Sequence, residues 1–287
     1  MKLPYYPGCT LYTKAKPLNT SLLSCFDAIG VELAELPHWY CCGTTFTLAR
    51  DNRMSLIAPL RILAKAQHEG ERVLVPCSIC YNTLKRTNFI LKEDEETLDI
   101  INEHLEESYD GNETVLHPLE FFRDNEKLLR SKVKKSLKEF KVGCYYGCLL
   151  LRPETEIQFD DPEKPTIFET FVSMIGATPI DFPLKVECCG SYLVVNSPDA
   201  AVEASYKLLR NAQGNGADVV VTSCPLCHYN LDALQDKIKK AHPEFKEIPV
   251  FYFSQLLAIA LGVEKQNLGL EQNKVSPYEI LKEYDLL

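Results

Sequence analysis

The chain has 287 residues, of which 46% are hydrophobic and 25% charged, a globular composition that excludes a disordered chain, a collagen-like fibre and a disulfide-held mini-protein. Its 40 acidic and 31 basic residues give a formal net charge of −9, which argues against nucleic-acid binding because phosphate neutralisation requires basic residues. No apolar run approaches the roughly 20 residues of a membrane-spanning helix, and the N-terminus contains no signal-peptide core. We therefore expect a cytoplasmic protein without a membrane span.

Short β-branched runs alternate with segments of helical periodicity along the whole chain, a pattern typical of parallel sheets covered by helices. The first part of the chain is predicted to form strands at 2–6, 31–35, 72–75 and 113–116, and helices at 18–29 and 55–68. The second part is predicted to form strands at 141–145, 178–182, 218–222 and 250–253, and helices at 165–175, 198–213 and 225–241. The acidic stretch 93–112 has no equally long counterpart in the second part and is interpreted as a solvated insertion.

Twelve cysteines are present, and ten of them form two matching sets. The first set is Cys9, Cys41, Cys42, Cys77 and Cys80, and the second is Cys148, Cys188, Cys189, Cys224 and Cys227. In each set a Gly-Cys is followed by a Cys-Cys-Gly and then by a C-x-x-C, and 35 positions separate the Cys pair from the C-x-x-C in both. This agreement indicates an internal duplication. We predict an α/β protein of two similar parallel-sheet halves, residues 1–138 and 139–287, each binding an iron–sulfur group for the reasons that follow.

Every one of these cysteine motifs comes directly after a predicted strand. In parallel α/β sheets the turns that follow strands collect at the carboxyl edge, where ligands bind. We therefore expect the five thiols of each half to lie together. A C-x-x-C at the start of a helix is also favoured as thiolate, because the helix N-terminus offers free N–H groups and a positive dipole end.

Three chemistries compete for such thiols in a chain without an export signal. Structural zinc takes four ligands, often from two C-x-x-C pairs, but here the two pairs are 147 positions apart. A redox dithiol needs only a single C-x-x-C. An iron–sulfur cluster is selected by soft thiolates, and the adjacent Cys41 and Cys42 can reach two different irons of a cluster, with Gly43 allowing close backbone approach. The density and repetition of the motifs favour iron and sulfur.

The doubled arrangement of a Cys, a Cys-Cys-Gly and, 33 residues later, a C-x-x-C resembles the CCG-domain proteins, most of all the B subunit of heterodisulfide reductase; the first spacing is 31 residues in the first half and 39 in the second. The resemblance covers nearly the whole chain and implies two non-cubane [4Fe–4S] clusters, one on each five-cysteine set, with Gly43 and Gly190 beside them. It implies a reductase that cleaves an anionic disulfide, in methanogens the mixed disulfide of coenzyme M and coenzyme B, between two clusters that face one cleft.

The chain lacks the C-x-x-C-x-x-C-x-x-x-C-P run of ferredoxin modules, so its electrons are expected to come from another polypeptide of a complex. The resemblance implies a ferredoxin-like C subunit that docks to a flavin-containing A subunit. Two alternatives stay open: an electron-transfer subunit that serves a quinone or a protein partner without disulfide chemistry, and a structural zinc scaffold.

Other residues near the motifs have both a functional and a structural interpretation. Cys25 is expected to be buried and inert, and Cys144 is either buried or a further ligand, with burial favoured. His38 is a candidate proton donor to a product thiolate or a packing residue, and His228 either tunes its cluster by hydrogen bonding or caps a turn. Five basic residues are candidates for binding an anionic disulfide, with surface solvation as the default: Lys14, Lys16, Arg50, Arg53 and Lys185.

Overall fold

Two four-stranded parallel sheets organise the computed structural model, which describes residues 1–44, 53–105 and 108–287. The first sheet has the order β2-β1-β3-β4, and its strands are Glu32–Glu35, Lys2–Tyr5, Arg72–Leu74 and Thr114–Leu116. The second has the order β6-β5-β7-β8, and its strands are Thr178–Ile180, Lys141–Cys144, Val219–Thr222 and Val250–Tyr252. The two orders are identical once the numbering is shifted by four, so the predicted duplicated α/β fold is confirmed.

The strands are short, and β7, with the sequence Val-Val-Val-Thr, is buried at all four positions, whereas the edge strands β2 and β6 have no fully buried residue. Such a continuous β-branched run suits a central strand of a parallel sheet that helices cover on both faces. In register, Lys2 pairs with Glu32 and Val73 with Val115, while Lys141 of the other sheet pairs with Thr178.

The helices of the first half are α1 (Lys16–Ala28), α2 (Ile57–Glu69), α3 (Ser78–Glu93), α4 (Glu95–Asn102), α5 (Pro118–Asp124) and α6 (Glu126–Lys132). Those of the second half are α7 (Glu154–Ile157), α8 (Ile167–Met174), α9 (Leu193–Asn196), α10 (Pro198–Gly214), α11 (Pro225–His228), α12 (Gln235–Ala241), α13 (Phe253–Leu261) and α14 (Tyr278–Glu283). The sequence prediction missed α3, α5 and α13. It was also wrong in treating 225–241 as one helix, because a π-helical turn at Tyr229–Ala233 separates α11 from α12.

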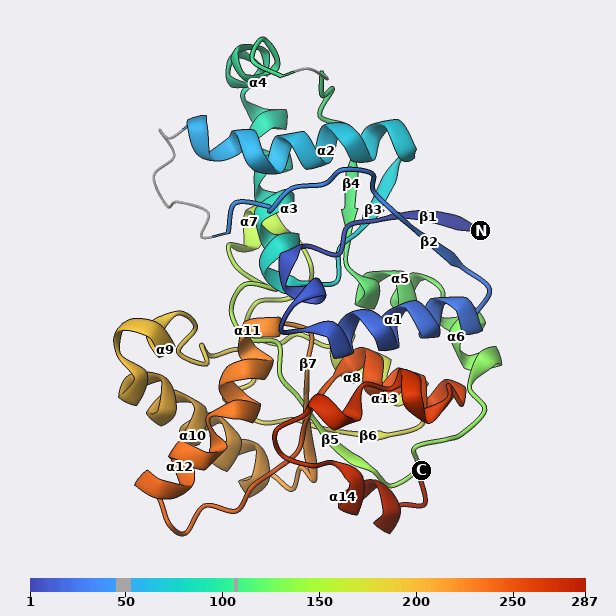
Figure 1. Ribbon diagram of the computed structural model, residues 1–287, viewed down its shortest axis with the longest axis vertical. Coiled ribbons are helices and arrows are strands. Elements are labelled where there is room, and N and C mark those ends of the chain that lie inside the picture. The colour runs from blue at the N-terminus through green and yellow to red at the C-terminus, as the bar shows by residue number, and fades with distance from the viewer. Residues whose placement is uncertain (45–52, 106–107) are drawn as a thin grey trace.

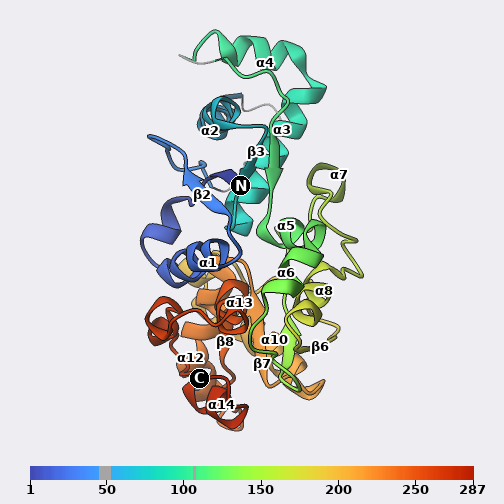
Figure 2. The ribbon, with the colours of Figure 1, turned by 90° about the vertical axis from the view of Figure 1, so that its right-hand side faces the viewer.

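Helices from the two halves pack against each other between the sheets, where Figures 1 and 2 show α1, α5, α8 and α13 in the middle of the molecule. Helix α1 of the first half contacts α13 of the second, and α5 of the first half contacts α8 of the second. Phe171 of α8 lies 5.7 Å from Phe122 of α5 and 5.8 Å from Phe253 of α13, measured between ring centroids. The two halves therefore share one aromatic core, which holds their sheet edges in a defined relation.

Candidate metal centres

All ten cysteines of the two predicted sets lie at the carboxyl ends of strands. In the first half Cys9 follows β1, Cys41 and Cys42 follow β2, and Cys77 caps the N-terminus of α3 after β3. The second half repeats this, since Cys148 follows β5, Cys188 and Cys189 follow β6, and Cys224 caps α11 after β7. The expected position of the motifs on strand-to-helix turns is thus the position observed.

Side-chain contacts connect the five thiols within each half. The sulfurs of Cys42 and Cys80 are 3.4 Å apart, and Cys80 also contacts Cys77 while Cys9 contacts Cys41. In the second half the sulfurs of Cys189 and Cys227 are 3.6 Å apart. The further contacts there join Cys227 to Cys224, Cys188 to Cys189 and Cys148 to Cys188. Equivalent cysteines make equivalent contacts, so the duplication extends to the arrangement of the sulfur atoms.

These contacts lower the pKa of some thiols in each set and raise the pKa of others. The hydrogen bond with Cys80 lowers the pKa of Cys42 to about 7, and the same bond, together with one to Cys77 and burial, raises the pKa of Cys80. In the second half the bond with Cys148 lowers the pKa of Cys188. Mutual hydrogen bonding therefore favours thiolate at some positions of each set, and thiolate is the form that binds soft metals.

Two glycines that the sequence analysis did not assign to the site leave space for the sulfurs. Gly8 and Gly147 precede the first cysteine of their sets, and their φ angles are 72° and 67°. A Cβ added at Gly8 would lie 2.8 Å from Sγ of Cys80, and one at Gly147 would lie 3.2 Å from Sγ of Cys227. A side chain there would displace the C-x-x-C sulfur. The Gly-Cys pair that occurs in both halves is the feature of the sequence that could have identified these two glycines.

The backbone conformation by itself favours glycine at the third position of each Cys-Cys-Gly motif. Gly43 and Gly190 have φ angles of 88° and 89°, which side chains disfavour. A Cβ on Gly190 would also lie 2.8 Å from Cα of Ala201 in α10. Their contact with a cofactor stays a prediction.

A buried tyrosine anchors each Cys-Cys turn, which the sequence analysis also missed. The hydroxyl of Tyr6 donates a hydrogen bond to the carbonyl of Tyr40 at 2.8 Å, and that of Tyr145 donates to the carbonyl of Glu187 at 2.7 Å. Each acceptor immediately precedes the Cys pair of its half. Both tyrosines lie three positions before the first cysteine of the set, so one side chain ties the first motif to the second in both halves.

The C-x-x-C turns of the two halves contact each other and so bring the two thiol sets into one region. The hydroxyls of Ser78 and Ser223 are 2.8 Å apart, and a small pocket of about 10 Å³, room for about one water molecule, lies between Ser78 and Ile79 of the first half and the thiols of the second. Burial, and then the negative charges of thiols in both halves, Cys224 and Cys77 among them, raise the pKa of Tyr192 to about 12. Tyr192 therefore lies near both thiol sets. The sulfur sets therefore share one region of the molecule.

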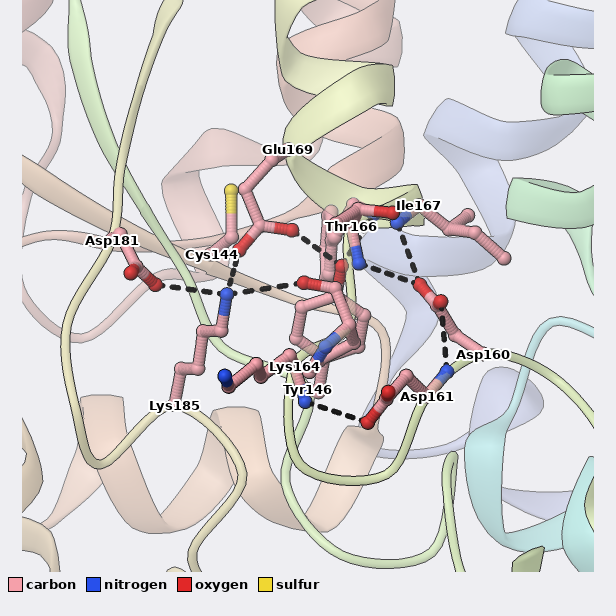
Figure 3. Close-up of polar contacts among 12 residues, drawn as sticks. Cys144, Tyr146, Asp160, Asp161, Lys164, Thr166, Ile167, Glu169, Asp181 and Lys185 are labelled. Carbon is pink, nitrogen blue, oxygen red and sulfur yellow. Dashed lines mark hydrogen bonds and ion pairs between the residues drawn. The ribbon is translucent and has the colours of Figure 1, made fainter.

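Lys185, one of the basic candidates for substrate binding, already forms ion pairs with neighbouring carboxylates, as Figure 3 shows. Its Nζ lies 2.6 Å from Glu169 and 2.8 Å from Asp181, and it donates to the carbonyl of Pro165. Glu169 in turn accepts a hydrogen bond from Tyr146. This network fixes the loop before Cys188, so the structure favours a structural role for Lys185.

The remaining candidates fall outside the thiol sets. His38 is exposed and lines a hollow together with Lys65 and His68, so its role as a proton donor stays a prediction. Lys14 and Lys16 are exposed, Arg53 pairs with Glu96 at 3.5 Å, and Arg50 lies outside the described residues.

Three further side chains are buried; burial was expected for Cys25 and favoured for Cys144, whereas His228 was expected to bond its cluster or to cap a turn. Cys25 contacts the carbonyl of Ser254, and Cys144 lies on β5. His228 stacks on Tyr252 with ring centroids 4.0 Å apart and bonds the carbonyl of Val250 at 3.1 Å. Burial lowers the pKa of His228 to about 4.

The donor set of each half fits an iron–sulfur group. Each half presents five soft sulfur donors on three separate turns, with Gly8 or Gly147 leaving room beside them. Among the residues that the structure describes, no three His, Cys, Asp or Glu side chains are arranged to hold a single metal ion directly.

Comparison with known proteins assigns the family. A family model for a cysteine-rich domain, CCG, matches residues 3–85 and 142–232, which contain all ten cysteines of the two sets. The chain belongs to the CCG family of cysteine-rich domains. It is 35% identical over 274 residues to the 8-methylmenaquinol:fumarate reductase membrane anchor subunit of Wolinella succinogenes, covering 94% of this chain and 96% of that one.

A second relative of this CCG protein is the B subunit of the ferredoxin/F420H2-dependent CoB-CoM heterodisulfide reductase of Methanosarcina acetivorans. It is 30% identical over 291 residues, covering 98% of this chain and 96% of the relative. Both relatives are named as subunits of oxidoreductase complexes, and this chain is a homologue of both. Within the described part of the chain, no helix has the length and apolar character needed to cross a bilayer.

Among solved structures, a hypothetical protein from Helicobacter pylori has the same fold as this CCG protein. Their TM-score is 0.78 at 16% identity, with 95% of this chain covered. The match spans only 51% of the Helicobacter chain, so that protein is about twice as long.

Proposed function

We propose that this chain is the catalytic subunit of a heterodisulfide reductase-like complex and that it reduces an anionic disulfide to two thiols between two non-cubane [4Fe–4S] clusters. The observation that carries the proposal is the contact of the two C-x-x-C turns at Ser78 and Ser223, with the adjoining pocket. A bond that is cleaved between two centres requires such proximity.

In this proposal the five cysteines of each half hold one cluster. The first would sit on Cys9, Cys41, Cys42, Cys77 and Cys80, and the second on Cys148, Cys188, Cys189, Cys224 and Cys227. When bound, the clusters would supply single electrons and Lewis-acidic iron for the two sulfur atoms of the substrate.

The outer cysteines of both sets are accessible to a substrate. Cys9, Cys41 and Cys188 are exposed and Cys148 is partly exposed, whereas the C-x-x-C thiols are buried. The outer cysteines occupy equivalent positions in the two halves, so a disulfide would approach both sets through equivalent openings. Its cleavage takes up two electrons and two protons and releases two thiols.

The electrons would come from partner proteins, by homology a ferredoxin-like C subunit docked to a flavin-containing A subunit. The heterodisulfide reductase relative is named as one subunit of such an enzyme. The cytoplasmic location expected from the sequence belongs to this proposal as well.

Anaerobic purification tests the proposal. We expect about eight irons per chain, because two clusters of four irons each are bound. Electron-spin signals of the oxidised protein should change on addition of the thiol products. Four or fewer irons, or signals that ignore both thiol and disulfide, would contradict it.

A second function, electron transfer from a quinol to a partner without disulfide chemistry, is favoured by one observation. The relative at 35% identity carries 8-methylmenaquinol:fumarate reductase in its name. A pure relay should have clusters that a menaquinol reduces and should not respond to thiols or disulfides. Parallel titrations of one preparation with a menaquinol and with a thiol therefore separate the two functions.

A further inference from the structure

A buried asparagine contacts the Cys-Cys-Gly turn of the second half. Asn230 lies three positions after Cys227 and is fully buried. Its side-chain Nδ2 lies 3.1 Å from the carbonyl oxygen of Cys189, 3.1 Å from that of Ser191 and 3.5 Å from Sγ of Cys189. The amide thus joins the C-x-x-C helix to the Cys pair and donates toward a sulfur of the set.

The orientation of this amide follows from its neighbours. Reversal would place Oδ1 against two carbonyl oxygens, so Nδ2 must face the turn, with its two protons serving three acceptors. Oδ1 of Asn230 has no hydrogen-bond partner among the described residues, and an unpaired buried acceptor costs free energy that an apolar side chain would avoid. The donor function is therefore the reason for an asparagine at this position.

The backbone is also altered at this point. Asn230 belongs to the π-helical turn Tyr229–Ala233, whereas the C-x-x-C of the first half opens the continuous α-helix α3. Such turns within helices often accompany functional sites, because the extra residue redirects a side chain. Here the redirected helix carries the asparagine that reaches Cys189.

The equivalent position in the first half holds a different donor. Thr83 lies three positions after Cys80, and its side chain makes a hydrogen bond with Cys42, the counterpart of Cys189. Its hydroxyl also donates to the carbonyl of Ile79 at 3.0 Å. Thr83 therefore shares one proton between a carbonyl and a sulfur, and Asn230 shares two protons among two carbonyls and a sulfur.

We propose that Asn230 and Thr83 are positioning residues that raise the reduction potential of the cluster in their own half by donating to Sγ of Cys189 and Cys42. The inference rests on the proposed binding of clusters by these cysteines. A donor to a ligand sulfur stabilises the additional negative charge of the reduced cluster, and such hydrogen bonds are among the factors that set cluster potentials.

Redox titration of the anaerobic protein, followed by electron-spin resonance with iron counted in each sample, tests the inference. Asn230→Leu removes the donor. At the wild-type midpoint of the second cluster, its reduced-to-oxidised ratio should fall about fivefold, the effect of losing roughly one hydrogen bond. Thr83→Val should shift only the first cluster, in the same direction. Thr83→Ser keeps the hydroxyl and should retain the wild-type midpoint.

Full iron with unmoved midpoints in Asn230→Leu would overturn the inference, and so would equal shifts of both clusters. If Asn230→Leu loses its iron, the comparison of Thr83→Val with Thr83→Ser tests the inference instead, because Val has the shape of Thr but no hydroxyl. Identical midpoints of the first cluster in these two variants would refute the donor role. A wild-type protein without about eight irons would instead contradict the proposed clusters themselves, so the two failures are distinguishable.

Discussion

The hydroxyl oxygens of Ser78 and Ser223 lie 2.8 Å apart although 145 positions separate them in the chain. Both side chains are buried, Ser78 at 1% exposure and Ser223 at 0%, so water cannot replace either partner. Ser78 lies inside the first C-x-x-C and Ser223 directly precedes the second. This single contact therefore ties together the two turns that carry the innermost thiols of both sets.

Ser78→Ala should lower the free energy of unfolding by about 1 to 3 kcal/mol, because it leaves the buried hydroxyl of Ser223 without its partner. Ser223→Ala should have a similar effect. The double variant should cost less than the sum of the two, since it leaves no unpaired group behind. Denaturant unfolding of the four proteins measures this coupling, and strictly additive losses would show that the contact carries no energy.

Cys41→Ala should remove one cluster and leave the other, so that iron falls from about eight to about four per chain. Cys25→Ala is the matched control, because Cys25 is fully buried on α1 with its sulfur 3.4 Å from the carbonyl of Ser254. Iron analysis and the visible absorption of both variants check the prediction. Unchanged iron in Cys41→Ala would contradict the ligand assignment, and iron loss in Cys25→Ala would contradict its inert role.

The fold class was predictable because the duplicated motifs mark the ends of equivalent strands. Cys42 and Cys77 have the same separation as Cys189 and Cys224, and the two sheets have the same strand order. The positions of the thiols on strand-to-helix turns followed from this order and from the geometry of parallel sheets.

Features that depend on packing between distant residues were not predictable. The contact of α1 with α13 arises from two faces far apart in the chain, and no local period encodes it. The hydrogen bond from Tyr6 to the carbonyl of Tyr40 likewise requires β1 and the Cys-Cys turn to be placed first. The helix α3 was missed because polar residues, Asn82 and Thr83, follow its C-x-x-C and hide the apolar stripe.

Lys185→Met should lower stability by about 1 to 3 kcal/mol, because it leaves the carboxylate of Glu169, only 17% exposed, without its ion-pair partner. Asp181→Asn removes the other partner, but that side chain is 81% exposed and its loss should cost less than about 1 kcal/mol. Comparison of the two unfolding curves tests this order. A smaller effect for Lys185→Met than for Asp181→Asn would show that the pair shown in Figure 3 does not hold the loop.

Glu113 makes the stability dependent on pH. Its carboxylate is 2% exposed, neither oxygen has a hydrogen-bond partner among the described residues, and burial, with the charges of Asp110 and Glu71, raises its pKa to about 8. Between the ordinary carboxyl pKa of about 4.3 and this value, the folded state holds a proton that the unfolded state has lost. The contribution of Glu113 to stability is therefore present at low pH and is lost as the pH rises through this window.

Glu113→Gln replaces the carboxyl group with a neutral amide of the same shape and should remove this dependence. The two proteins should have similar stability near pH 5, whereas at pH 8 the variant should be more stable by about 1 to 3 kcal/mol. Melting temperatures of both proteins across this range measure the difference, in which the contributions of all other titrating groups cancel. A difference that stays constant from pH 5 to pH 8 would show that Glu113 is ionised in the folded protein throughout, and that its burial does not hold the proton.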